Sequence, residues 1–104
     1  KTLHQEVAKI VKKFPRDYKY LSQQLLRSSL SPVLNIAEGA AKRSDRDYNR
    51  YLENAMGSVN ETVAGLEVAV GLGLITTEEF RILEKKHADL VNQLGGFSKK
   101  LKSG

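Results

Sequence analysis

A chain of 104 residues can form one domain around a single hydrophobic core, and we expect residues 1–104 to do so. The absence of cysteine excludes disulfides and thiolate metal sites, and no apolar run approaches the roughly 20 residues that span a bilayer. The net charge of +5 favours polyanionic partners, although basic surfaces also occur on proteins that have none.

The first helix is expected over residues 2–14, where apolar side chains recur at helical spacing: Leu3, Val7, Ile10, Val11 and Phe14. Pro15 ends it, because the residue before a proline is pushed out of the helical region. The sequence begins without a methionine, which predicts that the natural protein extends further upstream. No basic-then-apolar secretory leader is visible, so the expected location is the cytoplasm.

The second helix is expected over residues 17–41 and carries two adjacent apolar stripes. The first consists of Leu21, Leu25, Ser29, Pro32, Ile36 and Ala40. The second consists of Leu26, Leu30, Val33 and Ala37. This arc is wider than one neighbour requires, so it fits either a central helix with two neighbours or a subunit interface through Leu26, Leu30 and Val33. Pro32 removes a backbone hydrogen bond and predicts a kink near Ser28 and Ser29.

The third helix is expected from its candidate N-cap, Ser44, to about Leu72. Its core stripe follows a nearly unbroken 3–4 spacing: Tyr48, Leu52, Ala55, Val59, Val63, Leu66 and Val70. Gly57 and Gly65 lie on one strip of this helix. That arrangement favours a close helix approach, although a neutral surface position would fit as well.

Gly73 has the position of a helix-ending glycine, and Thr76 with Glu79 forms a capping box that begins a fourth helix. The seam of this helix has coiled-coil-like spacing: Phe80, Leu83, His87, Leu90, Leu94, Phe97 and Leu101. Two glycines weaken its last turns, and residues 99–104 are expected to fray. Four helices with short connections predict an all-α, up-down-up-down four-helix bundle.

The segment Asn35-Ile36-Ala37-Glu38-Gly39, followed by Lys42-Arg43-Ser44, resembles the NIAEG…RRS signature of the bacterial four-helix bundle family named after 23S rRNA intervening sequences. Residues 55–59 and 72–75 are similar to that family's ALGSL and LGYI segments, and Phe14-Pro15 matches its FP. The chain departs from the family pattern at Val63 and Leu74, where an acidic residue and a tyrosine are usual.

The resemblance implies a four-helix bundle for which no enzymatic activity is established. Relatives that act as accessory proteins of diversity-generating retroelements form pentamers and bind nucleic acid and a reverse transcriptase through basic surfaces. By this resemblance we expect a homo-oligomer, with a pentamer favoured, and RNA, DNA or a reverse transcriptase as partners.

Two clusters of basic residues precede and follow the second helix. The first comprises Lys12, Lys13, Arg16 and Lys19. The second comprises Lys42, Arg43, Arg46 and Arg50. Antiparallel packing places them at opposite ends of the bundle. The second cluster fits either a phosphate-contacting patch or a solvated corner partly neutralised by nearby carboxylates. Of the four tyrosines that flank the clusters, Tyr48 is expected in the core, and Tyr20 and Tyr51 are candidates for stacking on bases.

Glu84 and His87 have the Glu-x-x-His spacing of di-iron bundles, but the second element and the further carboxylates of such sites are missing. His87 is therefore expected as a core or interface histidine, and no metal or cofactor is expected. Because the sequence contains no phosphate loop, nucleophile elbow or paired-carboxylate motif, we expect no enzyme and assign no catalytic residue. Glu38 is expected to pair with Arg27 or Arg43, within the fold or across an interface, and Asn35 to bond to a neighbouring helix.

Two functional hypotheses follow. In the first, an oligomeric bundle binds RNA or DNA without strong sequence specificity through Lys42, Arg43, Arg46 and Arg50, with Lys12 and Lys13 as a second contact. In the alternative, the chain is a protein-interaction or assembly module whose charge serves solubility only.

Overall fold

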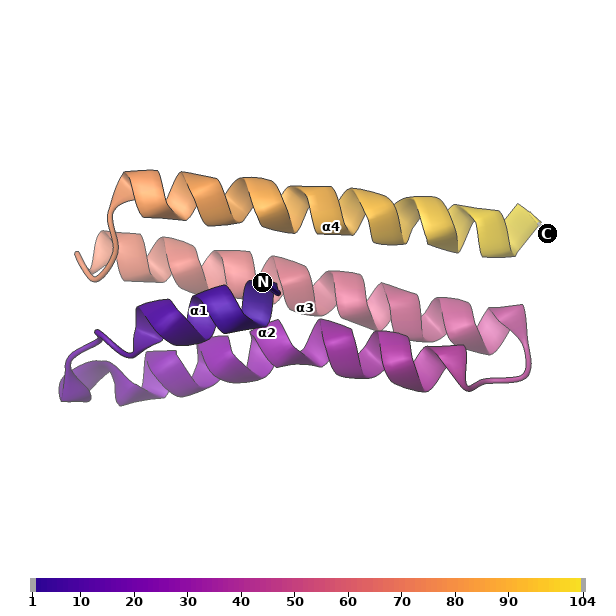
Figure 1. Cartoon of the computed structure of the whole chain (residues 1–104), viewed down its shortest axis with the longest axis horizontal. Helices are drawn as coiled ribbons and strands as arrows, with labels where there is room; N and C mark the ends of the chain where they lie inside the picture. The colour runs from indigo at the N-terminus through magenta and orange to yellow at the C-terminus, as the bar shows by residue number, and fades with distance from the viewer. Residues whose placement is uncertain (1, 104) are drawn as a thin grey trace.

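The computed structural model describes residues 2–103, and all of their regular structure is helical. The elements are α1 (Leu3–Val11), the short 3-10 helix η1 (Arg16–Tyr18), α2 (Lys19–Ala40), α3 (Asp45–Gly71) and α4 (Thr77–Ser103). Successive helices run in opposite directions and pack side by side in a rod of about 46 × 22 × 21 Å (Figure 1). The predicted up-down-up-down four-helix bundle is therefore confirmed.

The helix ends follow local chemistry that the sequence carries. The Ser44 side chain accepts a hydrogen bond from the Asp47 N–H at 3.1 Å and begins α3. Gly73, at φ +75°, ends α3, because the N–H of Leu74 bonds to the Ala69 carbonyl and the N–H of Gly73 to the Val70 carbonyl. These caps explain why the expected boundaries of α3 agree with the structure to within a residue.

The first helix is shorter than the sequence predicts. It ends at Val11, because the N–H groups of Lys13 and Phe14 bond to carbonyls three residues back, which tightens the chain before Pro15. The start is fixed by a capping box between Thr2 and Gln5 that the sequence analysis did not identify. As a result α1, with 9 residues, accompanies only one half of the long helices (Figure 1).

The core consists of two clusters, one in each half of the rod. The first core lies beneath α1 and is centred on Val7, Val11, Leu21, Leu25, Leu66, Ala69, Ile75 and Leu83. The second core lies beyond α1, where the described chain supplies only α2, α3 and α4, and is centred on Leu52, Ala55 and Leu94. A layer of buried polar side chains separates them: Ser28, Ser29, Thr62 and His87. The half with four helices has the larger core.

The two glycines on the strip of α3 have different roles. A Cβ at Gly65 would lie 2.7 Å from Leu25 Cδ2, so this glycine permits close packing of α3 on α2. A Cβ at Gly57 would meet nothing within 4 Å. Close helix approach is therefore correct for Gly65, and a neutral surface position is correct for Gly57.

Pro32 is buried inside α2, and the helix continues through it to Ala40. The hydroxyls of Ser28 and Ser29 donate to the carbonyls of Leu25 and Leu26, at 3.4 and 3.3 Å. Both serines therefore direct their hydroxyl protons to carbonyls of the preceding turn of α2. The kink itself stays a prediction.

Candidate nucleic-acid interface

The corner between α2 and α3 displays the predicted basic cluster on the surface. Lys42, Arg43, Arg46 and Arg50 are all exposed. Gly39, at the end of α2, is buried under the first turns of α3. A Cβ at this position would lie only 2.7 Å from Tyr51 Cβ and 2.8 Å from Tyr48 Cδ1, so only glycine permits this close approach. The glycine of the NIAEG segment thus lets the first turns of α3 pack against the end of α2.

The tyrosines at this corner support the basic side chains and the core. Lys42 Nζ lies 5.2 Å from the centre of the Tyr51 ring, and Arg50 Cζ lies 5.7 Å from the same ring, both within cation–π distance. Tyr48 is half-buried and meets Phe97 edge-to-face at 5.2 Å, which agrees with its predicted place in the core. Tyr51 therefore lies among the cations of this corner, and its stacking on a base stays a prediction.

Three lysines of α4 lie beside this corner, although the sequence did not lead us to include them in the basic cluster. Lys99, Lys100 and Lys102 are exposed on the last turns of α4, which end beside the α2–α3 corner (Figure 1). Lys102 and Arg46 line the same surface depression. The expected fraying of this tail is wrong for the described residues, since α4 continues to Ser103. The alternating helix directions could have predicted this position of the lysines, because they place the C-terminal ends of α2 and α4 at the same end of the bundle.

We call these seven residues the basic end: Lys42, Arg43, Arg46, Arg50, Lys99, Lys100 and Lys102. Acidic side chains offset part of their charge. Arg50 Nη2 lies 3.8 Å from Asp47 Oδ1, and Lys102 Nζ lies 3.8 Å from Glu53 Oε1. Both pairs are largely exposed, so water and salt screen them and they contribute about 0–1 kcal/mol each. The positive excess at this end therefore remains available to an anionic partner.

The second predicted cluster lies at the other end of the rod, at the turn between α1 and α2 (Figure 1). One member of this cluster, Lys13, lies near Glu79 at the start of α4. The pKa of Glu79 lies below its usual value, first because the Thr76 N–H bonds to its carboxylate and also because Lys13 is nearby. Lys12, Lys13, Arg16 and Lys19 are thus separated from the basic end, as antiparallel packing predicts, and Lys13 has an acidic neighbour. Tyr20, exposed at 63%, is the open aromatic side chain near this cluster.

His87 is a core histidine, as expected from its place on the seam. It is only 2% exposed, its Nδ1 bonds to the Leu83 carbonyl at 2.7 Å, and burial lowers its pKa. In the described residues no group of three or more side chains could hold a metal ion.

Two expected polar contacts are absent in residues 2–103. Glu38 is exposed and forms no ion pair there, because Arg27 instead donates to Gln24 of its own helix. Asn35 also bonds within α2, to Ser31 at 3.0 and 2.9 Å, and Ser31 in turn contacts Ser58 of α3 at 2.8 Å. The expectation of a direct bond from Asn35 to a neighbouring helix was wrong, because Ser31 forms that link.

Of the predicted oligomer contacts, Leu30 and Val33 are exposed at 38% and 48%, while Leu26 is half-buried and packs on the first core. Leu26 therefore contributes to the fold, and the interface role of the three residues stays a prediction. Among the described residues, no helix is both long and apolar enough to cross a membrane.

No curated protein sequence matches the chain. A family model described as 23S rRNA-intervening sequence protein matches residues 1–96, which is nearly the whole chain and includes the NIAEG segment and the α2–α3 corner. The chain belongs to the family of 23S rRNA-intervening sequence proteins.

Proposed function

We propose that this chain is a non-enzymatic, oligomeric bundle that binds RNA or DNA through the basic end, without strong sequence specificity. The observation that carries the proposal is that seven exposed basic residues, from the α2–α3 turn, α3 and α4, lie at one end of the rod. Lysine and arginine side chains that contact phosphates supply most of the affinity of non-specific nucleic-acid binding.

The chemistry of this end favours contacts to the backbone of the nucleic acid. Lys42 and Arg50 lie near the Tyr51 ring and Tyr48 packs on Phe97, so the exposed groups of this end are mainly cationic. Phosphate contacts position a protein on nucleic acid but carry no sequence information. Repetition of the basic end around an oligomer, with a pentamer favoured by the family resemblance, would add modest single-subunit attractions into useful avidity.

The test is fluorescence anisotropy of labelled RNA and DNA across a salt titration. Replacement of Lys42, Arg43, Arg46 and Arg50 with alanine is expected to weaken binding and to reduce the slope of log K against log salt by roughly 3 at most, about 0.7–0.9 for each lost phosphate contact. The matched control replaces Lys12, Lys13, Arg16 and Lys19, which removes the same charge from the other end. An equal loss in both variants would show a diffuse charge effect and would exclude the basic end as the site.

A second candidate function, a protein-interaction or assembly module, is favoured by the outer face of α2. Three large apolar side chains on α2 are exposed to solvent: Leu34 at 56%, Val33 at 48% and Leu30 at 38%. Such a stripe is typical of a surface that meets a second copy or another protein, a reverse transcriptase included.

Substitution of Leu30 and Leu34 with aspartate, measured by light scattering coupled to gel filtration, tests this candidate. Helix content should stay near the wild-type value, because both side chains lie outside the two cores. A fall in mass with nucleic-acid binding retained would separate assembly from binding. An unchanged mass would exclude these residues from the interface.

A further inference from the structure

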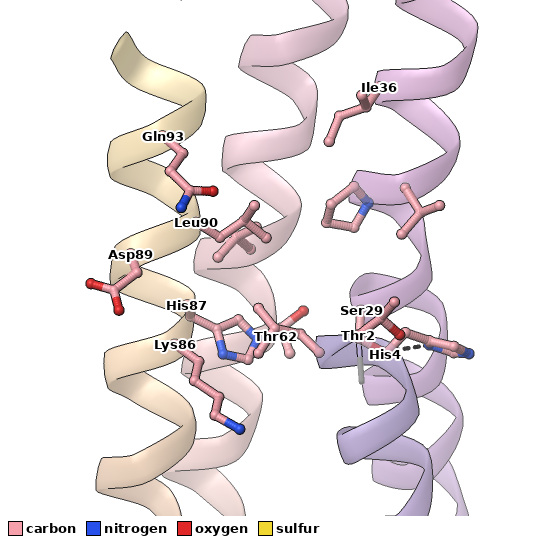
Figure 2. Close-up of a pocket in the computed structure, with 14 residues that line it drawn as sticks. Thr2, His4, Ser29, Ile36, Thr62, Lys86, His87, Asp89, Leu90 and Gln93 are labelled. Carbon is pink, nitrogen blue, oxygen red and sulfur yellow. Dashed lines mark hydrogen bonds between the residues drawn. The ribbon is translucent and has the colours of Figure 1, made fainter. Parts of the chain in front are cut away.

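A groove opens at mid-rod, where α1 begins. Its volume is about 410 Å³, within the range of roughly 300–1,000 Å³ typical of small-molecule sites. The first residues of α1 lie at its foot, and α2 and α4 form its two walls. Figure 2 shows Ile36 of α2 and Leu90 of α4 directed toward the space between these walls. The groove exists because α1 accompanies only half of the bundle.

The lining is largely apolar, with most of the polar groups at the foot and with Asp89 and Gln93 on the α4 wall (Figure 2). The apolar side chains are Leu3, Pro32, Val33, Ile36, Val59 and Leu90. At the foot, Thr62 Oγ1 lies within hydrogen-bond distance of Ser28 Oγ, at 2.8 Å, and of the Ser58 carbonyl, at 2.9 Å, and His4 bonds to Ser29. Lys86 forms an ion pair with Glu6 of α1. The polar groups at the foot therefore already have partners within the protein.

His87 is the exception. Its Nδ1 must donate to the Leu83 carbonyl, so in the neutral ring Nε2 is an acceptor. The side chain is 2% exposed and lines the groove, and no hydrogen bond joins Nε2 to residues 2–103. Nε2 is not one of the fully enclosed polar atoms that lack a partner, so it remains accessible to a donor from outside the protein, water or a bound molecule.

We propose that this groove binds a small, uncharged apolar molecule that carries one hydroxyl or N–H group, which donates a hydrogen bond to Nε2 of His87. The apolar walls receive the body of the molecule, and His87 fixes its orientation. An anionic ligand fits less well, because Lys86 is already paired with Glu6 and burial favours the uncharged form of His87. The site is independent of the basic end, which lies at one end of the rod.

The test uses 2-naphthol, which has a hydroxyl donor, and 2-methylnaphthalene, which has the same shape without one. Both are titrated into the full chain and followed by amide chemical shifts. Saturable shifts centred on residues that line the groove are expected. In His87→Phe, the ratio of the two association constants, naphthol over methylnaphthalene, should fall roughly two- to twelvefold, the value of one net hydrogen bond.

Two further variants locate the site. Ile36→Trp fills the groove and should abolish binding of both probes, whereas Ile82→Trp adds the same ring on an exposed position of α4 that does not line the groove and should leave binding unchanged. Circular dichroism checks that each variant is folded.

Three results would overturn the proposal: no saturable binding to the wild-type chain, an unchanged ratio in His87→Phe, or equal binding by Ile36→Trp. If the probes fail and Ile36→Trp instead lowers the mass of an oligomer, a second copy of the chain covers the groove.

Discussion

At Gly39 the absence of a side chain determines how closely α2 and α3 approach. Gly39→Ala would place a methyl group 2.7 Å from Tyr51 Cβ, and this neighbour cannot rotate away because it is attached to the backbone. We expect a loss of about 1–3 kcal/mol in the free energy of unfolding, typical of overpacking, measured by urea denaturation.

Gly57→Ala is the matched control on the exposed strip of α3. Because nothing lies within 4 Å of the new Cβ, the higher helix propensity of alanine should raise the free energy of unfolding by up to about 1 kcal/mol. Equal effects of the two substitutions would contradict the assigned close contact at Gly39.

His87 makes stability depend on pH near neutrality. Burial holds its pKa below the usual value of 6.5, so as pH falls below 6.5 the unfolded chain binds a proton that the folded chain does not. The free energy of unfolding should therefore fall between pH 7 and 5, by at most about 1.4 kcal/mol per pH unit from this one group.

Other groups near His87 influence its pKa or the pH dependence of stability, so the prediction needs a control. The Leu83 carbonyl and Glu6 of α1 oppose the lowered pKa, and Lys86 and His4 also line the groove. Glu79 acts at lower pH, since its pKa lies below 4.5 and its contribution is lost only as pH falls through that folded value. The difference between wild type and His87→Phe isolates the histidine, and parallel pH profiles would refute its role.

At the scale of elements, the start of α4 depends on a reciprocal cap. Thr76 Oγ1 accepts from the Glu79 N–H at 3.0 Å, and the Thr76 N–H donates to the Glu79 carboxylate at 2.9 Å. Thr76→Ala removes the first of these bonds and should lower the free energy of unfolding by about 1 kcal/mol, measured by denaturant titration. Thr77→Ala, at the exposed neighbouring position, should stay within about 0.5 kcal/mol of wild type. If Thr76→Ala and Thr77→Ala lowered the free energy of unfolding by similar amounts, the loss would not come from the cap.

The sequence predicted most helix boundaries because caps, prolines and glycines act within a few residues of their position. Ser44, Gly73 and Thr76 each bond to groups within five residues, so the pattern alone identified them. The end of α1 was missed because Phe14 packs on the first core after the helix has ended. A tertiary contact there continued the apolar spacing beyond the helix.

In the whole molecule, the charge of the basic end depends on where the C-terminal end of α4 lies relative to the α2–α3 turn (Figure 1). Replacement of Lys99, Lys100 and Lys102 with alanine should weaken RNA and DNA binding and reduce the salt slope by roughly 2–3, because these lysines lie beside the α2–α3 corner. Lys9, Arg81 and Lys85, exposed residues away from that end, supply a control triple of equal charge. Equal binding by the two triples would remove α4 from the interface.

Periodicity and contacts between near neighbours were enough to predict the helical class, the order and direction of the helices, the caps of α3 and α4 and the α2–α3 basic cluster. Packing of the helices decided which residues of different elements meet. It brought the lysines of α4 to the basic end, paired Tyr51 with cations, placed Gly39 against two tyrosines and left a groove above α1. The α4 lysines and the groove join residues far apart in the chain, and the contacts of Gly39 and Lys42 join the end of α2 and the turn after it to α3. The spacing of residues within one helix carries no information about such contacts.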